Sequence, residues 1–245
     1  GLVTGAVLPD AASIQRPSKK LAATSALREN YHRHRRVIVA GAMGVGKGTW
    51  LASMLVKLAW KGKRALFVVN RGELLDDVRA RALSIEPALP VGVVKAGRNE
   101  CDAPIVFASS QTIANPKRAA ALGRFDLCLW DEVHHMPSAG GQRTLAVLHE
   151  QSPDLRVIGT TATAFRNAGA GKTSGLGEIF EAVIHEYPLA EAQADGVLCP
   201  LQGYAEAPEG VDDDGEYLDT DTHNELVWAK YQEHGGGKAI LFARD

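Results

Sequence analysis

The 245-residue sequence has few cysteines, few aromatic residues and no long hydrophobic run. Its three cysteines lie far apart, are odd in number and form no CxxC pair, which excludes a disulfide scaffold and indicates reduced thiols. No apolar stretch reaches the roughly 20 residues of a membrane helix, because Lys57 interrupts the best candidate, residues 51–60. The first 36 residues lack the compact apolar core of a secretion signal. We therefore expect a cytoplasmic protein that does not associate with a membrane.

What the sequence does contain is the balance of an ordinary globular protein, with 45% hydrophobic and 23% charged residues. This length suits one large α/β domain, or one domain with part of a second. The formal net charge of −2 hides a strong asymmetry. Residues 1–150 contain 21 Lys and Arg against 12 Asp and Glu, whereas residues 151–245 contain 6 against 17. A polyanion, if one binds, would therefore meet the first half, although an uneven solvated surface would have the same composition.

Short apolar runs alternate with helical patterns along the first 160 residues. The expected strands cover residues 36–40, 64–70, 91–96, 104–109, 126–130 and 155–160. The expected helices cover residues 47–61, 73–83 and 142–150. Strands of nearly continuous apolar character are typical of a parallel sheet buried on both faces, and their alternation with helices predicts an α/β fold.

The last part of the chain differs from the rest. Residues 206–222 include eight acidic residues, which indicates an exposed linker. A helical pattern at 224–233 and a buried-strand pattern at 238–243 follow. We expect residues 1–200 to form one domain, and residues 201–245 to hold a linker and the truncated start of a second domain.

A glycine-rich segment between the first expected strand and helix carries the strongest chemical signal. It consists of Gly41, Ala42, Met43, Gly44, Val45, Gly46, Lys47, Gly48 and Thr49. Such glycines let backbone N–H groups close around a phosphate chain, and the helix N-terminus adds its positive dipole end. Lys47 would supply a positive charge for the β- and γ-phosphates. A glycine turn without any ligand is the alternative.

One position of this segment departs from the usual phosphate-binding pattern. Gly48 stands where that pattern has Ser or Thr, whose hydroxyl holds Mg²⁺. Thr49 comes one residue late, and on a helix this turns its side chain about 100° away.

Two carboxylates, Asp131 and Glu132, follow the expected strand that ends at Trp130. The end of a central parallel strand places them at the carboxyl edge of the sheet, near the glycine-rich segment. Asp131 can hold Mg²⁺ through its water shell, and Glu132 can polarise an attacking water. Acidic residues are also common at strand ends. His134 and His135 follow, but no further ligand has a spacing that suits zinc.

Small hydroxyl residues lie at the end of another expected strand, in the segment 159–166. They could hydrogen-bond to the carboxylate segment and relay the state of a bound nucleotide. Taken alone, the same residues would indicate only a polar turn.

These three segments, in this order and spacing, resemble motifs of the superfamily 2 helicases and translocases over about residues 14–200. Residues 41–48 resemble motif I, residues 131–134 resemble a DExH motif II, and residues 161–163 resemble the S/T-A-T of motif III. The most similar branch is the DEAD/DEAH-box-like group with the type III restriction subunits. The resemblance implies an α/β fold, namely a RecA-like P-loop NTPase domain with a mostly parallel sheet flanked by helices. It also implies that residues 41–49 bind ATP, that Lys47, Asp131 and Glu132 are catalytic with Mg²⁺ at Asp131, and that His134, Thr161 and Thr163 couple hydrolysis to movement.

Further segments resemble other motifs of the family. Arg16 and Pro17 lie where that branch has an adenine-recognising segment, with Lys19 in place of its glutamine. Motifs Ia and Ib imply nucleic-acid contacts at Asn70, Arg71, Ser109 and Gln111. Ala164 replaces the proline that usually follows motif III. Residues 238–243 resemble the first strand of a second RecA-like domain, and the family's later motifs, including an arginine that reaches the γ-phosphate, would lie beyond residue 245, so we expect little activity from this chain alone.

The resemblance implies the first motor domain of an ATP-dependent nucleic-acid helicase or translocase. Its expected partners are nucleic acid, DNA rather than RNA, and the remainder of a second RecA-like domain. The alternative is a nucleotide-binding regulatory or scaffold module with impaired hydrolysis, which Gly48, Lys19 and Ala164 favour. Another kind of P-loop ATPase or kinase is disfavoured by the ordered motifs II and III.

Overall fold

The computed structural model describes residues 18–162 and 175–200, together with residues 225, 228–229 and 231–233 near the C-terminus. Contacts divide the chain into two units, Gly1–Pro200 and Leu201–Asp245. In the second unit the described residues are helical, and the rings of Trp228 and Tyr231 lie 5.3 Å apart. The strand expected at residues 238–243 lies outside the described residues, so a second RecA-like domain stays a prediction.

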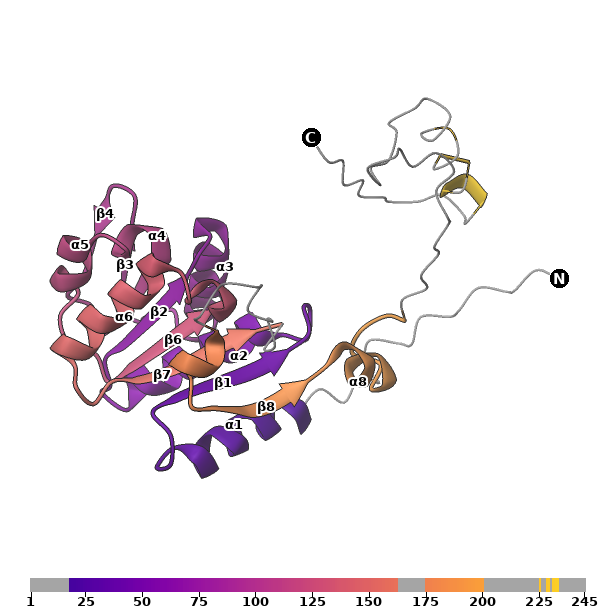
Figure 1. Cartoon of the computed structure of the whole chain (residues 1–245), viewed down its shortest axis with the longest axis horizontal. Helices are drawn as coiled ribbons and strands as arrows, with labels where there is room; N and C mark the ends of the chain where they lie inside the picture. Colours follow the sequence, from indigo (N-terminus) through magenta and orange to yellow (C-terminus); the bar gives the residue numbers. More distant parts are fainter. Residues whose placement is uncertain (1–17, 163–174, 201–224, 226–227, 230, 234–245) are drawn as a thin grey trace. The chain divides into compact units, whose positions relative to one another are not determined.

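The first unit is built on an eight-stranded sheet in the order β4-β3-β5-β2-β6-β7-β1-β8. Figure 1 shows its strands between two layers of helices. Every pair of neighbours is parallel except β3 and β4. The strand bounds are β1 Arg36–Gly41, β2 Ala65–Val69, β3 Val91–Lys95, β4 Arg98–Asn99, β5 Ile105–Ser109, β6 Leu127–Asp131, β7 Arg156–Thr161 and β8 Ala182–Tyr187. The prediction of a mostly parallel α/β sheet is confirmed.

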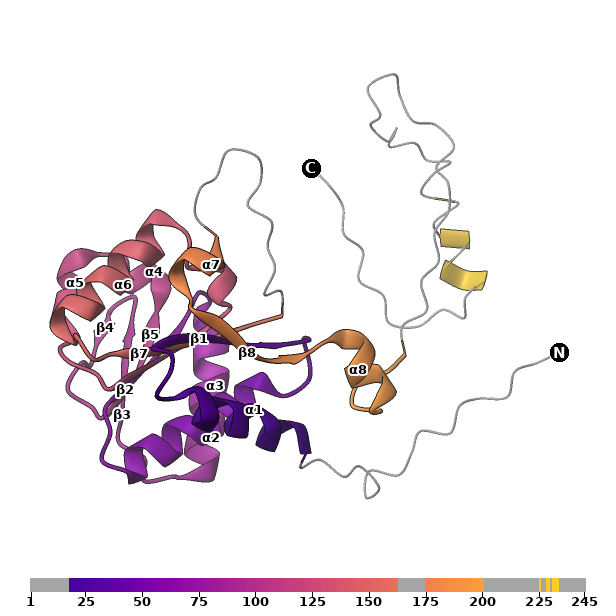
Figure 2. The ribbon, with the colours of Figure 1, turned by 60° about the horizontal axis from the view of Figure 1, so that its bottom comes forward.

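Helices cover both faces of this sheet, as Figure 2 shows from a second direction. α1 (Ser18–Asn30), α2 (Lys47–Trp60) and α3 (Gly72–Ile85) pack on one face, where their apolar residues form one core cluster with the strands. α4 (Ser110–Ile113), α6 (Ala139–Gln151) and α7 (Leu176–Ile179) contribute to the cluster on the other face. α5 (Pro116–Ala121) packs against α6, the 3₁₀ turn η2 (Val133–His135) follows β6, and α8 (Leu189–Ala194) follows β8.

The six strands expected from apolar runs are all present, and each agrees with its expected bounds to within one or two residues. β2 and β5 are buried along their whole length, which explains why their sequences are continuously apolar. α1 and the edge strands β4 and β8 were not expected. β8 contains His185 and Glu186 and is half-exposed, so only its pairing with β1 identifies it as a strand.

Among the described helices, none is both long and apolar enough to cross a membrane. Cys101, Cys128 and Cys199 are free thiols, the first two of them buried.

The strand order decides which chain segments meet at the carboxyl edge of the sheet. β7 lies directly between β1 and β6, so the segments that follow these three strands are neighbours although they are far apart in the sequence. In open α/β sheets, ligands bind outside the carboxyl ends of strands at such a crossover point.

Candidate nucleotide site

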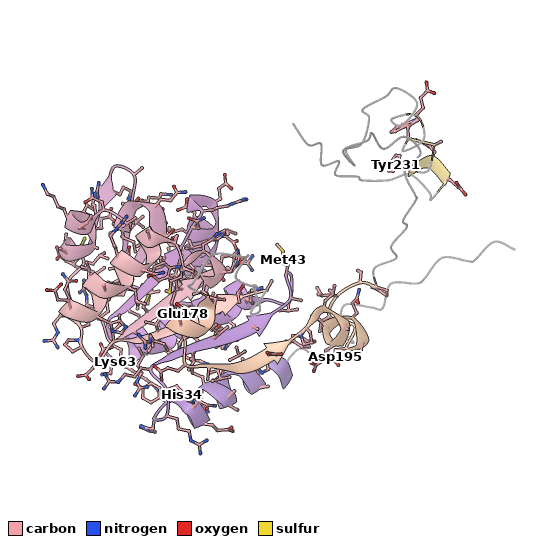
Figure 3. All side chains as sticks on the ribbon, viewed as in Figure 1. His34, Met43, Lys63, Glu178, Asp195 and Tyr231 are labelled. Carbon is pink, nitrogen blue, oxygen red and sulfur yellow. The ribbon has the colours of Figure 1, made fainter. Side chains whose placement is uncertain are left out.

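The glycine-rich loop joins β1 to α2 in a conformation that requires glycine at two positions. Gly44 and Gly46 have φ values of 84° and 91°, in the left-handed region that residues with a Cβ rarely adopt. Gly46 is also the N-cap of α2, so the helix begins immediately after the loop, at Lys47. Met43 lies at the exposed tip of the loop, where Figure 3 labels it. Loop and helix N-terminus together form the geometry that favours a phosphate group.

The side chain of Lys47 folds back over the loop from which its helix starts. Its Nζ donates to the carbonyl oxygens of Gly41 at 2.7 Å and Ala42 at 3.1 Å. Burial lowers the pKa of Lys47, while the nearby carboxylates of Asp131 and Glu132 oppose that shift. The structure therefore brings together the three residues that the sequence indicated as catalytic.

Two hydrogen bonds hold Asp131, and both are accepted by the same carboxylate oxygen, Oδ1. Thr160 Oγ1 donates to Asp131 Oδ1 at 2.6 Å, and the backbone N–H of Glu132 donates to the same atom at 3.0 Å. Thr160 is directly opposite Asp131 in the register of β6 and β7 and is fully buried, and Asp131 is 8% exposed. The two bonds fix the direction of the carboxylate.

Glu132 has an unusual backbone conformation. Its φ of 50° makes it the one non-glycine residue with positive φ in the described part of the chain. Such a conformation costs on the order of 1–3 kcal/mol and is typical of functional sites. Burial is the main cause that raises the pKa of its carboxyl group; the negative charge of Asp131 adds to this, and Lys47 opposes it. Glu132 therefore holds a proton more readily than an ordinary glutamate.

His134 connects Glu132 to the strand end of β7. Its Nδ1 lies 3.2 Å from Thr161 Oγ1 and 3.2 Å from Glu132 Oε2. The carboxylate segment and the hydroxyl segment are thus joined by two side-chain contacts, Thr160 with Asp131 and Thr161 with His134. The predicted residues Thr163 and Arg16 lie outside the described residues.

Thr160 is a functional candidate to which the sequence analysis assigned no role. The segment that contains it was expected to hydrogen-bond to the carboxylates, but only the register of β6 and β7 shows which threonine faces Asp131. β8 contributes a second unexpected neighbour, because the backbone N–H of Ala42 donates to the carbonyl of Tyr187 at 3.0 Å. A small cavity of about 50 Å³ lies there, lined by the loop, Trp50, His185 and Tyr187 among others.

The four residues predicted to contact nucleic acid lie at the same sheet edge, beyond β6. Asn70 and Arg71 follow β2, Ser109 is the last residue of the adjacent strand β5, and Gln111 lies in α4 directly after it. Ser110 Oγ donates to Asn70 Oδ1 at 2.9 Å and joins the two segments. Arg71 and Gln111 are exposed, Asn70 is partly buried, and Ser109, at 7% exposure, is the most buried of the four residues.

The residues of the site fit a magnesium ion held together with a nucleotide. Among the described residues, no group of three or more His, Cys, Asp or Glu side chains could hold a metal. Mg²⁺ instead is commonly bound by one or two carboxylates, substrate phosphates and water, and Asp131 supplies such a carboxylate. Thr49 Oγ1 accepts a hydrogen bond from Arg81 at 3.3 Å, so its hydroxyl faces α3.

Gly48 leaves room for a Cβ atom. A Cβ at this position would lie 3.6 Å from Val78 Cγ2 and 3.9 Å from Arg81 Nε, which is ordinary van der Waals contact. The fold therefore does not require glycine here to avoid a clash with a Cβ atom.

The order of these motifs agrees with a known protein family. Residues 13–166 match the family described as the res subunit of type III restriction enzymes. The chain belongs to this family. The match covers the glycine-rich loop, the DExH segment and the hydroxyl segment. It confirms the resemblance to the N-terminal RecA-like domain of superfamily 2 helicases.

Individual relatives agree with this assignment. The putative mitochondrial ATP-dependent helicase Irc3 of Schizosaccharomyces pombe is 30% identical over 155 residues, which cover 59% of this chain and 25% of that protein. This chain, a member of the res-subunit family, therefore spans only about a quarter of the length of that curated relative.

Two solved structures show the same fold. The Sulfolobus solfataricus SWI2/SNF2 ATPase core in complex with dsDNA has a TM-score of 0.50 at 15% identity, over 62% of this chain and 34% of that one. A nuclease-deletion mutant of the type ISP restriction-modification enzyme LlaGI, with a DNA substrate mimic, has a TM-score of 0.55 at 14% identity, over 74% and 20%. At these identities the likeness shows the fold alone.

Proposed function

We propose that this chain is the ATP-binding motor domain of an ATP-dependent nucleic-acid helicase or translocase. One observation carries the proposal: Lys47 after β1 and the Asp131–Glu132 pair after β6 meet at one sheet edge, and β7 between them supplies two threonines that contact the carboxylate segment. Membership of the res-subunit family supports the same conclusion.

The glycine-rich loop is the proposed phosphate site, formed by residues 41–49 with Arg16 on the adenine side. The backbone N–H groups of the loop would face the phosphates, and the start of α2 adds its positive end. Lys47 Nζ now donates to two loop carbonyls, and we expect it to exchange these for the β- and γ-phosphate oxygens of ATP. The charge-assisted bonds would be stronger than the bonds they replace.

Asp131 is the proposed protein ligand for Mg²⁺. A bound Mg²⁺ would neutralise charge on the phosphate oxygens. Thr160 and the Glu132 backbone hold Oδ1 in place, so the direction of the carboxylate is set before any ligand arrives.

Glu132 is the proposed base for hydrolysis. Its carboxylate would accept a proton from the attacking water as the water oxygen bonds to the γ-phosphorus and the bond to the β-phosphate oxygen breaks. ADP and inorganic phosphate are the products. His134 and Thr161 would transmit the state of this site to the rest of the domain, because His134 contacts Glu132 and Thr161 contacts His134.

Nucleic acid is the proposed substrate track, contacted by Asn70, Arg71, Ser109 and Gln111. The two similar structures named above hold dsDNA and a DNA substrate mimic, which supports DNA as the polymer. Movement would also need a second RecA-like domain that closes on the ATP site. The cytoplasmic location stays a prediction, and the relative Irc3 is named as mitochondrial.

A nucleotide-binding regulatory module is the second candidate. It is favoured by Gly48 and by the hydrogen bond that turns the Thr49 hydroxyl toward Arg81, since both reduce the oxygen ligands available to a metal.

ATP turnover with and without single-stranded or duplex DNA separates the two functions. The chain joined to a complete second RecA-like domain is compared with its Lys47→Ala variant. DNA-stimulated turnover that disappears in the variant supports the motor function. Nucleotide binding without turnover supports the regulatory module, and the absence of both overturns the nucleotide site.

A further inference from the structure

A second cavity lies at the opposite edge of the sheet from Lys47. It has a volume of about 1130 Å³ and is lined by the amino ends of β6 and β7 and by the last residues of α1 and α2. Figure 3 labels His34 and Lys63 at this end and Met43 at the far end of β1. The length of β1 separates the two edges by roughly 17 Å. We call this cavity the amino-edge groove, and the side chains that matter in it are Arg28, Tyr31, Lys57, Trp60, Lys61 and Arg124.

The amino-edge groove is strongly basic. Seven Lys and Arg residues line it against two Asp residues. The two carboxylates are already occupied, because Asp126 pairs with Lys63 at 3.0 Å and Asp154 with Arg35 at 3.3 Å. Of the five remaining cations, Arg156 donates to the backbone carbonyls of Tyr31 and His34. The other four, Arg28, Lys57, Lys61 and Arg124, form no ion pair with any residue that the structure describes.

Compensation of helix dipoles explains only part of this charge. The last residues of α1 and α2 and the C-cap residue of α6 line the groove, and a helix C-terminus carries about half a negative charge. Three such ends amount to about −1.5 charges against a side-chain surplus of about five. A positive charge of about 3.5 remains that these helix dipoles do not compensate.

Exposed aromatic rings lie among these cations. Trp60 is 64% exposed, and its Nε1 donates to Glu86 Oε2 at 3.2 Å, which holds the indole at the rim. Tyr31 is 46% exposed and has the Arg156 guanidinium 3.9 Å from its ring centre. A basic groove with stacking surfaces is the arrangement that binds single-stranded nucleic acid without sequence preference.

The groove has room for a polymer segment. Its volume of about 1130 Å³ only slightly exceeds the roughly 300–1,000 Å³ typical of small-molecule sites, so its positive charge and exposed rings are what favour a nucleic acid.

We propose that the amino-edge groove binds a segment of single-stranded nucleic acid, with phosphates on Arg28, Lys57, Lys61 and Arg124 and a base on Trp60. This site goes beyond the proposed function, because it lies at the edge opposite the nucleotide site and needs no ATP. It would hold the strand at a second point while Arg71 and Gln111 contact it at the carboxyl edge.

The test measures binding of the full chain to a fluorescent oligothymidine of about 16 nucleotides, without nucleotide, over a series of salt concentrations. The groove variant is Lys61→Glu with Arg124→Glu. Its matched control is Lys117→Glu with Arg143→Glu, which changes net charge equally at two exposed cations outside the groove. We expect the salt slope of log K to become shallower by about 1.4 in the groove variant alone, because each phosphate contact on a single strand contributes about 0.7.

The aromatic contact is tested by Trp60→Ala against Trp228→Ala, a tryptophan of similar exposure in the second unit. Only Trp60→Ala should weaken binding, by about 5-fold to 150-fold. Unfolding midpoints equal to the wild type would show that the variants fold.

Equal losses in the groove variant and its control overturn the proposal, because net charge alone would then explain binding. Unchanged binding in the groove variant also overturns the proposal. A third contradicting result is that polyglutamate, and not the oligothymidine, binds in a way that depends on the groove residues. If instead the proposed function is wrong, ATP turnover is absent but the differences in oligothymidine binding between these variants remain.

Discussion

Replacing Thr160 by valine removes one buried hydrogen bond and preserves the shape of the side chain. The lost bond joins Thr160 Oγ1 to Asp131 Oδ1 at 2.6 Å, between a fully buried donor and a carboxylate that is 8% exposed. A hydrogen bond to a charged group contributes about 1.5–3 kcal/mol. The additional buried methyl group of valine returns about 0.8 kcal/mol. We expect the first unit to lose about 1–2 kcal/mol of unfolding free energy.

Thr160→Val should also weaken the binding of Mg²⁺–ATP. After Thr160→Val, Asp131 Oδ1 keeps only its bond from the backbone N–H of Glu132, so the carboxylate can rotate. Loss of a group that orients a metal ligand typically costs about 10-fold to 100-fold in metal affinity or activity. We therefore expect Mg²⁺–ATP to bind about 10-fold to 100-fold more weakly, whereas binding of ATP without Mg²⁺ changes little.

Thr160→Ser is the matched control. It keeps the hydroxyl and deletes one buried methyl group, at a cost of about 0.5–1.5 kcal/mol. Both variants therefore lose similar stability in urea unfolding followed by circular dichroism, but only the valine variant loses the bond to Asp131. Calorimetric titration with Mg²⁺–ATP separates them. Equal weakening in both variants, or none in the valine variant, would refute the role of Thr160 in orienting Asp131.

Four further substitutions have defined outcomes. Lys47→Ala should strongly weaken ATP binding in equilibrium titrations and leave the fold intact, because its Nζ bonds only to loop carbonyls in the described part of the chain. Glu132→Gln should keep ATP binding and reduce turnover by about 10²- to 10⁴-fold in the two-domain protein, since the amide cannot accept the proton of the attacking water. Gly48→Thr should tighten Mg²⁺–ATP binding and raise turnover in a magnesium titration, because a Cβ at this position meets only ordinary van der Waals contacts and a hydroxyl on it would offer Mg²⁺ an oxygen ligand. Asp126→Asn should lower the unfolding midpoint at pH 7 and leave it unchanged at a pH below the folded pKa of Asp126. Hydrogen bonds from the Arg64 backbone and the Lys63 amine hold that pKa below its ordinary value despite the opposing effect of burial, so their stabilisation is lost as the pH falls through it.

Each of these expectations has a result that contradicts it. Unchanged ATP affinity in Lys47→Ala at matched folding would mean that the loop is not the phosphate site. Normal turnover in Glu132→Gln would rule out this residue as the base. No gain in Gly48→Thr would show that another oxygen already serves the metal or that the site does not hydrolyse ATP. An equal loss of stability at all pH values in Asp126→Asn would assign its effect to packing.

The sequence by itself determined the fold class and predicted most residues of the candidate site. Its apolar runs are strands because a parallel strand covered on both faces must be apolar along its whole length, and β2 and β5 are buried in this way. The glycines at 44 and 46 and Lys47 could be recognised because their role depends on local backbone conformation, which neighbouring residues largely fix. Asp131 and Glu132 were recognisable for a related reason, since they end an apolar strand.

Only the tertiary structure decided which residues face one another. The pairing of Thr160 with Asp131 depends on the register between β6 and β7, strands separated by 24 residues of chain, and no local pattern encodes that register. β8 was missed because an edge strand needs no continuous apolar sequence and is held by its pairing with β1. The amino-edge groove was also beyond the sequence, because its cations come from α1, α2 and several loops that meet only where parallel strands begin. The sequence showed that the first half of the chain is basic, and folding decided where that charge is concentrated.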